Sequence, residues 1–166
     1  MTVSATQLQA GEAADRMDGL RAPRLSTDFL NRYSEALMLI EMAESDDSVI
    51  EDLKSWRNLC YRGHFEISAL RCAAEALVAY DRLDPARRKS FEEVCRSMAR
   101  LVATVTALLV EKPRPAELPT IIEVASEALR RLITRSTQFI NANGTIDIAT
   151  FDDASLQGEI DALLAR

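Results

Sequence analysis

The most regular hydrophobic pattern in the chain runs from Asp84 to Glu111. Apolar side chains recur there in alternating steps of three and four residues, which places them on one face of an α-helix. Asp84 is a favourable N-cap, because its side-chain oxygen accepts a free backbone N–H. Pro85 is a favourable first helical residue, because the N–H that proline lacks would have no partner within the helix at that position. A helix of about 40 Å with one wide apolar face is unstable alone, so the pattern predicts partner helices. The apolar face consists of Phe91, Val94, Cys95, Met98, Leu101, Val102, Val105, Leu108 and Leu109.

Helical periodicity also precedes this stretch. A first helix begins after Pro23 with Ser26 or Thr27 as its cap, and a second follows Ser48, which has capping-box spacing to Glu51. The inner face of the first helix carries Phe29, Tyr33, Ala36, Leu37 and Ile40.

The stretch from Asn58 to Gly63 is harder to assign, because the glycine can end one helix, start another or lie inside a bent one. We favour a break there, followed by a helix to about Arg82. The short turn at Leu83 then predicts that this helix and the long one are antiparallel neighbours. The inward-facing residues of the predicted helix are Ile67, Leu70, Ala74, Leu77 and Val78.

Three prolines between Lys112 and Pro119 end the long helix and favour an extended connection. Further helices are predicted from about Thr120 to Ile140 and from Asp152 or Asp153 onward. The predicted fold class is all-α, an antiparallel helical bundle of five to six helices with a long central helix. Residues 1–24 hold few large apolar groups and are expected to form a flexible tail, which leaves 25–166 as a single helical-bundle domain.

Composition narrows the possible functions. The 20 basic and 26 acidic residues give a net charge of −6, which opposes binding to nucleic acid or to an anionic membrane. Cys60, Cys72 and Cys95 form no CxxC pair, and no secretory signal or membrane-spanning stretch is visible. We therefore expect reduced thiols and a cytoplasmic location.

Two surface features are candidate partner-binding sites. Met38, Leu39 and Met42 lie outside the main stripe of the first helix, so they are either enclosed or meet another subunit, and we expect a homodimer. The second feature is a basic corner before and within the first turns of the long helix, where cations oppose the helix dipole and favour an anion or an acidic partner. It consists of Arg82, Arg87, Arg88 and Lys89.

His64 is the only histidine, and Gly63 beside it would leave room for a phosphoryl group, so phosphotransfer is one alternative. The other interpretation is a structural histidine. Residues 141–147 resemble the middle of an EF-hand calcium loop, but Phe139 and Thr150 occupy its two strongest ligand positions, and a helix C-cap at Asn143 and Gly144 explains the same residues. No metal or other cofactor is predicted.

Nothing in the pattern pairs a nucleophile with a base or forms a phosphate-binding glycine loop. We therefore expect a non-enzymatic protein that acts through protein–protein interaction, in a regulatory or scaffold role. Two alternatives stay open: a phosphotransfer component that uses His64, and a bundle that encloses an apolar ligand.

Overall fold

The computed structural model describes residues 21–148, 158, 161–163 and 165, and these residues contain helices but no β-strand. The all-α fold class is therefore confirmed. The predicted tail up to residue 20 and the predicted helix start at Asp152 or Asp153 lie outside the described residues. The elements are η1 (Thr27–Leu30), α2 (Asn31–Met42), α3 (Val49–Ser55), α4 (Tyr61–Glu66), α5 (Ala73–Asp81), α6 (Pro85–Val110) and α7 (Leu118–Asn141).

Helix α6 begins where the sequence places it. The Asp84 carboxylate accepts a hydrogen bond from the backbone N–H of Arg87 at 3.1 Å, and Pro85 is the first helical residue. The whole predicted apolar face is buried, apart from Leu108, which is partly buried. The regular pattern over 26 residues thus predicts both the bounds and the buried side of this helix.

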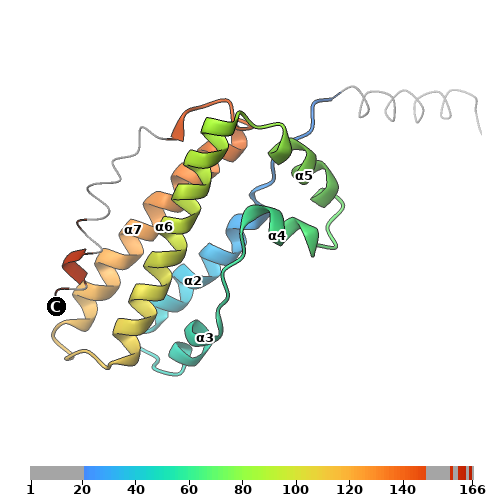
Figure 1. Ribbon diagram of the computed structural model, residues 1–166. Helices are drawn as coiled ribbons and strands as arrows, with labels where there is room; N and C mark the ends of the chain where they lie inside the picture. Colours follow the sequence, from blue (N-terminus) through green and yellow to red (C-terminus); the bar gives the residue numbers. More distant parts are fainter. Residues whose placement is uncertain (1–20, 149–157, 159–160, 164, 166) are drawn as a thin grey trace, which may run out of the picture.

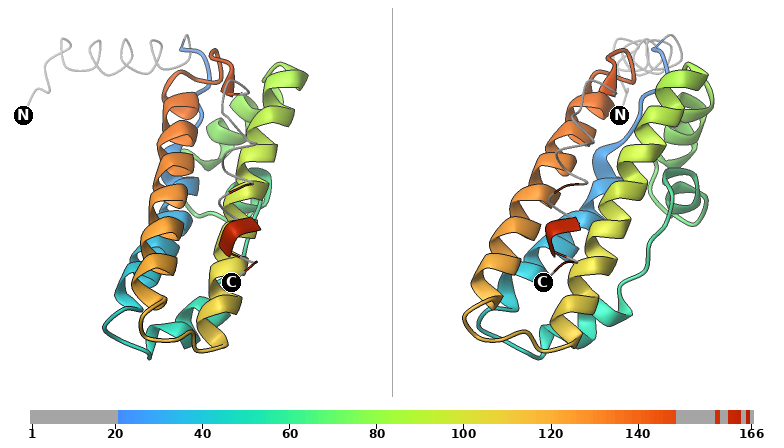
Figure 2. Two further views of the ribbon diagram at one scale, coloured as in Figure 1. Left: turned by 90° about the vertical axis from the view of Figure 1, so that its left-hand side faces the viewer. Right: turned by 60° about the vertical axis from the view of Figure 1, so that its left-hand side comes forward.

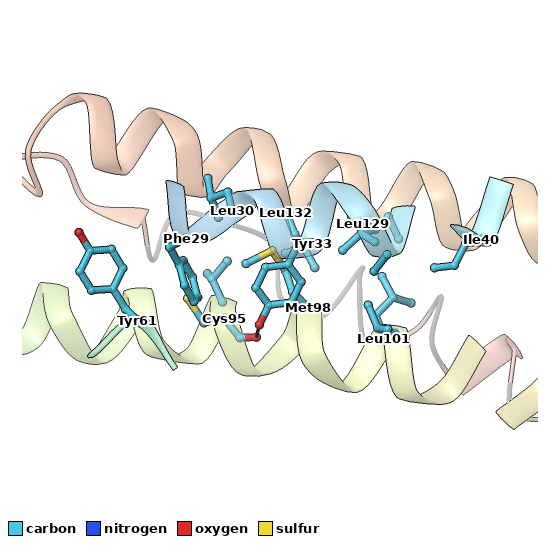
Figure 3. Close-up of a cluster of buried hydrophobic side chains, with 14 of the residues drawn as sticks. Phe29, Leu30, Tyr33, Ile40, Tyr61, Cys95, Met98, Leu101, Leu129 and Leu132 are labelled. Carbon is cyan, nitrogen blue, oxygen red and sulfur yellow. Dashed lines mark hydrogen bonds between the residues drawn. The ribbon is translucent and has the colours of Figure 1, made fainter. Parts of the chain in front are cut away.

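Helices α2, α6 and α7 lie side by side, and α7 runs back antiparallel to α6 (Figures 1 and 2). Side chains from all three helices fill the space between them (Figure 3). Tyr33 donates a hydrogen bond from its hydroxyl to Asn58 at 3.0 Å or to the carbonyl oxygen of Cys95 at 3.3 Å. This interior is packed with protein, which argues against an apolar ligand held between these helices. Its central side chains include Leu30, Tyr33, Ile40, Met98, Leu101, Leu129 and Leu132.

The middle of the chain differs from the prediction. The break comes earlier than expected, at residues 56–60, and Gly63 lies inside α4. The single helix to Arg82 is wrong, because residues 67–72 separate α4 from α5. A local turn explains the interruption, since the Ser68 hydroxyl accepts the backbone N–H of Leu70 at 3.2 Å and competes with helical bonding.

The buried face of this region is also wrong in the prediction. Ile67 is 74% exposed, and Leu70 and Val78 are exposed as well. Phe65 and Tyr80 are buried in their place. The main neighbour of α5 is α4 rather than α6, so the short turn at Leu83 does not produce the expected antiparallel pair (Figure 1).

The capping box expected at Ser48 does not form. Helix α3 does begin after Ser48, but the backbone N–H and the hydroxyl of Ser48 both donate to the Asp46 carboxylate, at 2.9 and 2.6 Å. A turn centred on Asp46 therefore leads into the helix in place of the reciprocal Ser48–Glu51 bonds.

The end of α7 is a left-handed cap that also holds the start of the described chain. Asn143 and Gly144 have φ values of 53° and 71°, and the Gly144 N–H donates to the carbonyl oxygen of Phe139 at 2.9 Å. The Asn143 amide accepts the N–H of Leu25 at 2.8 Å and donates to the carbonyl oxygen of Pro23 at 3.0 Å. Both ends of this amide are occupied, which favours the C-cap interpretation over a calcium loop.

Candidate functional site

A surface pocket of about 550 Å³ lies between α4, α5 and the first half of α6. Residues 58–60, in the extended segment before α4, form a further side of it. Its aromatic wall consists of Tyr61, Tyr80 and Phe91. A pocket of this volume is within the range that binds small ligands or single side chains of a partner.

One face of α6 contributes the charged side of the pocket. Arg88, Glu92 and Arg96 follow one another at intervals of four residues, so they lie on the same side of the helix. Lys89 lines the pocket beside them. Tyr61 meets Phe91 and Tyr80 bonds to Glu92, and these contacts connect this side of α6 with α4 and α5.

Tyr80 connects the aromatic wall to the charged side. Its ring stacks on Tyr61 with centroids 4.9 Å apart, and its hydroxyl donates to the Glu92 carboxylate. The guanidinium groups of Arg62 and Arg88 lie 5.7 and 5.9 Å from the ring centroid, within cation–π distance. Burial, and then the hydrogen bond and charge of Glu92, raise the pKa of Tyr80 well above its usual value, so the phenol stays a neutral donor.

The pocket carries an excess of positive charge. Its basic side chains are Arg62, Arg88, Lys89 and Arg96, and its acidic one is Glu92. Arg62 is neutralised by ion pairs with Asp81 and, at 3.8 Å, with Glu66. Among the described residues, no carboxylate forms an ion pair with the other three cations, in a chain whose net charge is −6. The field in this pocket therefore favours an anionic group.

The predicted basic corner contributes only part of this site. Arg88 and Lys89 line the pocket, whereas Arg82 and Arg87 are not among its lining residues. Arg96 was missed, although its spacing of eight residues from Arg88 is visible in the sequence. Arg62 could not be found from the sequence, because its place depends on how α4 packs.

His64 joins α4 to η1 and does not line the pocket. Its Nε2 atom is 2.8 Å from the Asp28 carboxylate, and its side chain is 15% exposed. The ring also meets Phe29 and Phe65 edge to face. Phosphotransfer requires an accessible imidazole nitrogen, so this geometry argues for a structural histidine.

The predicted methionine surface on α2 is smaller than expected. Met38 and Met42 are exposed, but Leu39 is only 8% exposed and belongs to the core. Leu39 is therefore unavailable to a partner while the protein is folded, because it packs with the other buried residues of α2. An ion pair between Glu41 and Arg130 links α2 to α7 next to the two methionines.

The three cysteines differ in access to solvent. Cys60 is exposed at the pocket, and its sulfur accepts the N–H of Gly63 at 3.3 Å, which caps α4. Cys72 is half-buried, with its sulfur 3.7 Å from the Ser26 hydroxyl. Cys95 is buried at the pocket floor, and burial raises the pKa of its thiol well above the usual value.

These environments predict stepwise thiol reactivity. With a disulfide reagent that reacts with thiols, at about pH 8, Cys60 should react first, Cys72 more slowly and Cys95 only after unfolding. The thiolate is the reactive species, and its access to the reagent decreases in this order. Absorbance of the released thiol gives the rates, and peptide mass spectrometry identifies each residue. Cys60→Ser should remove the fast phase, and a fast phase that persists in this variant would contradict the assignment.

Other kinds of site find no support in the described part of the chain. It contains no cluster of three side chains suited to a metal ion. None of its helices is long and apolar enough to cross a membrane. Comparison of the chain with protein-family models, with curated proteins and with solved structures finds no match.

Proposed function

We propose that this is a non-enzymatic binding protein that holds an acidic, partly apolar segment of a partner protein in the pocket along α6. The observation that carries the proposal is the set of cations Arg88, Lys89 and Arg96, which pair with no carboxylate of the described residues and surround a pocket with an aromatic wall. We also propose that the protein is cytoplasmic. Its fold in this proposal is an antiparallel bundle with α6 as the central helix.

The site suits a carboxylate better than a neutral group. A partner carboxylate placed between Arg88 and Arg96 would accept charge-assisted hydrogen bonds from guanidinium groups that form no ion pair with a carboxylate in the described part of the chain. The rings of Tyr61 and Phe91 are buried behind the pocket, and the half-buried Leu59 offers an apolar surface next to these cations. An acidic residue followed by an aromatic or aliphatic one would satisfy both parts.

The extent of the surface favours a polypeptide over a small anion. A second hollow of about 500 Å³ lies further along α6 and is lined by Leu53, Trp56, Ala103 and Ala107 among others. Asn58 lines both hollows. Together they follow α6 from Pro85 to Ala107, a length of roughly 33 Å. A segment with acidic residues at one end and apolar residues at the other would match this surface.

The contacts of the described cysteines and histidine support a binding role rather than catalysis. The Nε2 atom of His64 is bound to Asp28, and the sulfur of Cys60 accepts a backbone N–H. No hydrogen bond between these two side chains occurs among the described residues, so the geometry does not favour a thiol activated by a base.

Peptide selection tests the proposal without knowledge of the partner. A library of random dodecapeptides displayed on phage is selected on the wild-type chain, and the selected peptides are expected to combine Asp or Glu with aromatic or aliphatic residues. One selected peptide, labelled with fluorescein, then serves as a probe in fluorescence polarisation. Arg88→Glu and Arg96→Glu should each weaken its binding by about tenfold or more, because each change replaces attraction with repulsion.

Arg114→Glu is the matched control. Arg114 is exposed in the loop after α6 and lines neither hollow, so its reversal should change the affinity by less than about threefold. Selected peptides without acidic residues, or equal losses in all three variants, would refute the proposal. Trp56 in the second hollow is the only tryptophan, and its emission gives an independent reading of occupancy there.

A further inference from the structure

Helix α5 has an apolar outer face with no covering element in the described chain. Its sequence, AAEALVAYD, is apolar almost all round, which is typical of a helix buried on several sides. Seven large apolar side chains of the described chain are open to solvent, and three of them, Ile67, Leu70 and Val78, lie on α5 or in the segment just before it. Leu70 opens the turn that leads into α5, where its carbonyl oxygen accepts the Ala73 N–H at 3.1 Å, and the exposed Ala74 and Val78 follow on the helix. We use the term outer face of α5 for Ala74 and Val78 on the helix together with Ile67 and Leu70 in the segment before it.

We infer that the outer face of α5 is a homodimer interface, in which α5 packs antiparallel against α5 of a second copy of this chain. The face is accessible for such a contact, because α4 and α5 stand beside the upper part of α6 on the side away from α7 (Figure 1). Large exposed apolar patches of this kind mark interaction sites on soluble proteins.

The charges beside this face complement the same charges on a second copy of the chain. This favours a second copy as the partner that covers the face. Arg71 is exposed and has no ion-pair partner among the described residues. Glu75, four residues on, uses one carboxylate oxygen for the backbone N–H of Arg24 at 3.0 Å. Arg71 lies in the turn that leads into α5 and Glu75 in the first turn of the helix, so both charges stand beside the N-terminal part of the outer face. In an antiparallel two-fold pair each flank of the face meets its own copy.

A two-fold axis at Ala74 buries the apolar residues of the outer face and pairs the charged residues beside it. The small side chain of Ala74 allows the two helices to approach closely, with Val78 of each copy near Leu70, in the turn that leads into α5, of the other. The long side chain of Arg71 then reaches Glu75 of the other copy, and the symmetry makes two such ion pairs. A parallel pair would instead place Arg71 opposite Arg71.

The dimer would also support the candidate pocket. Tyr80, on α5, forms part of the pocket wall, and α4 is the main helix that packs against α5. Packing α5 against a second copy would hold this wall in place. The inference nevertheless stands on the outer face alone and does not require the proposed ligand.

Sedimentation equilibrium of the full chain tests the dimer. The wild type should give twice the monomer mass of 18.4 kDa at about 100 µM. Ala74→Arg places like charges at the two-fold axis, and should raise the dissociation constant at least about hundredfold. Because Ala74 is exposed in the monomer, far-UV circular dichroism of this variant should match the wild type. Met38→Arg, a charge on the other exposed apolar site, is the control and should remain dimeric.

Charge reversal tests the register. Arg71→Glu alone and Glu75→Arg alone should each raise the dissociation constant by about tenfold, and the double variant should return to within about threefold of the wild type. A wild type that stays monomeric, or a dimer lost in Met38→Arg and kept in Ala74→Arg, would overturn the inference. A double variant as weak as the single ones would overturn the antiparallel pairing.

Discussion

Phe91→Ala is expected to lower the free energy of unfolding by about 3–5 kcal/mol. Phe91 is fully buried and stacks on Phe139 of α7 with ring centroids 4.8 Å apart. It also meets Phe29 and Tyr61 edge to face. One side chain of α6 therefore contacts η1, α4 and α7, so its removal leaves a cavity where these elements meet. The aromatic wall of the candidate pocket loses Phe91 itself and the support of Tyr61.

Urea denaturation followed by circular dichroism measures this loss, and thermal melting should show a decrease of roughly 10 °C for a chain of this size. Val110→Ala is the matched control on the same helix. Val110 is exposed near the end of α6, so its truncation should change stability by less than about 0.5 kcal/mol. A Phe91→Ala loss no larger than that of the control would show that this aromatic cluster is not packed as described.

Gly144→Ala is expected to destabilise the protein by about 2–4 kcal/mol, from two causes that add. Gly144 has φ of 71°, in the left-handed region that costs alanine about 1 kcal/mol. A Cβ atom there would also overlap the end of the buried Leu83 side chain, which must move. The measurement is again equilibrium unfolding in urea.

The same substitution at two other glycines provides the controls. Gly158→Ala meets nothing within 4 Å, and Gly63→Ala meets only the Cys60 sulfur at 3.3 Å and Leu59 at 3.9 Å. Both lie in helical backbone, where alanine is favoured over glycine, so neither should cost more than about 0.5 kcal/mol. Leu83→Ala combined with Gly144→Ala separates the two causes, because it removes the overlap and leaves the backbone cost. Equal effects at all three glycines would contradict the cap geometry.

The long helices were predictable because their patterns repeat many times. Over the 26 residues of α6 and the 24 of α7, a single misplaced residue changes little, and both buried faces match the periodicity. The caps were readable for the same helices, since Asp84 and the pair Asn143–Gly144 are residue types with a definite backbone role.

The short helices α4 and α5 were not predictable in the same way. Six and nine residues give too few repeats to fix a face, and α5 is apolar on nearly every side. Which side is buried is decided by contacts distant in sequence, such as the stacking of Tyr80 on Tyr61. The candidate pocket depends on that packing. The sequence therefore revealed its charged side, through Arg88 and Lys89, but not its aromatic wall.

The Asn143 amide that holds Pro23 and Leu25 has a consequence for how the protein is made. The hydrogen bond to Leu25 closes a loop between residues 118 positions apart. At synthesis rates of about 5–20 residues per second, the ribosome needs roughly 10 s to reach Asn143 after Leu25 has been added. For that time the start of the described chain has no partner for these backbone groups. The last step of folding must therefore follow translation of α7, and a nascent chain halted before Asn143 would present an unfinished fold to chaperones and proteases.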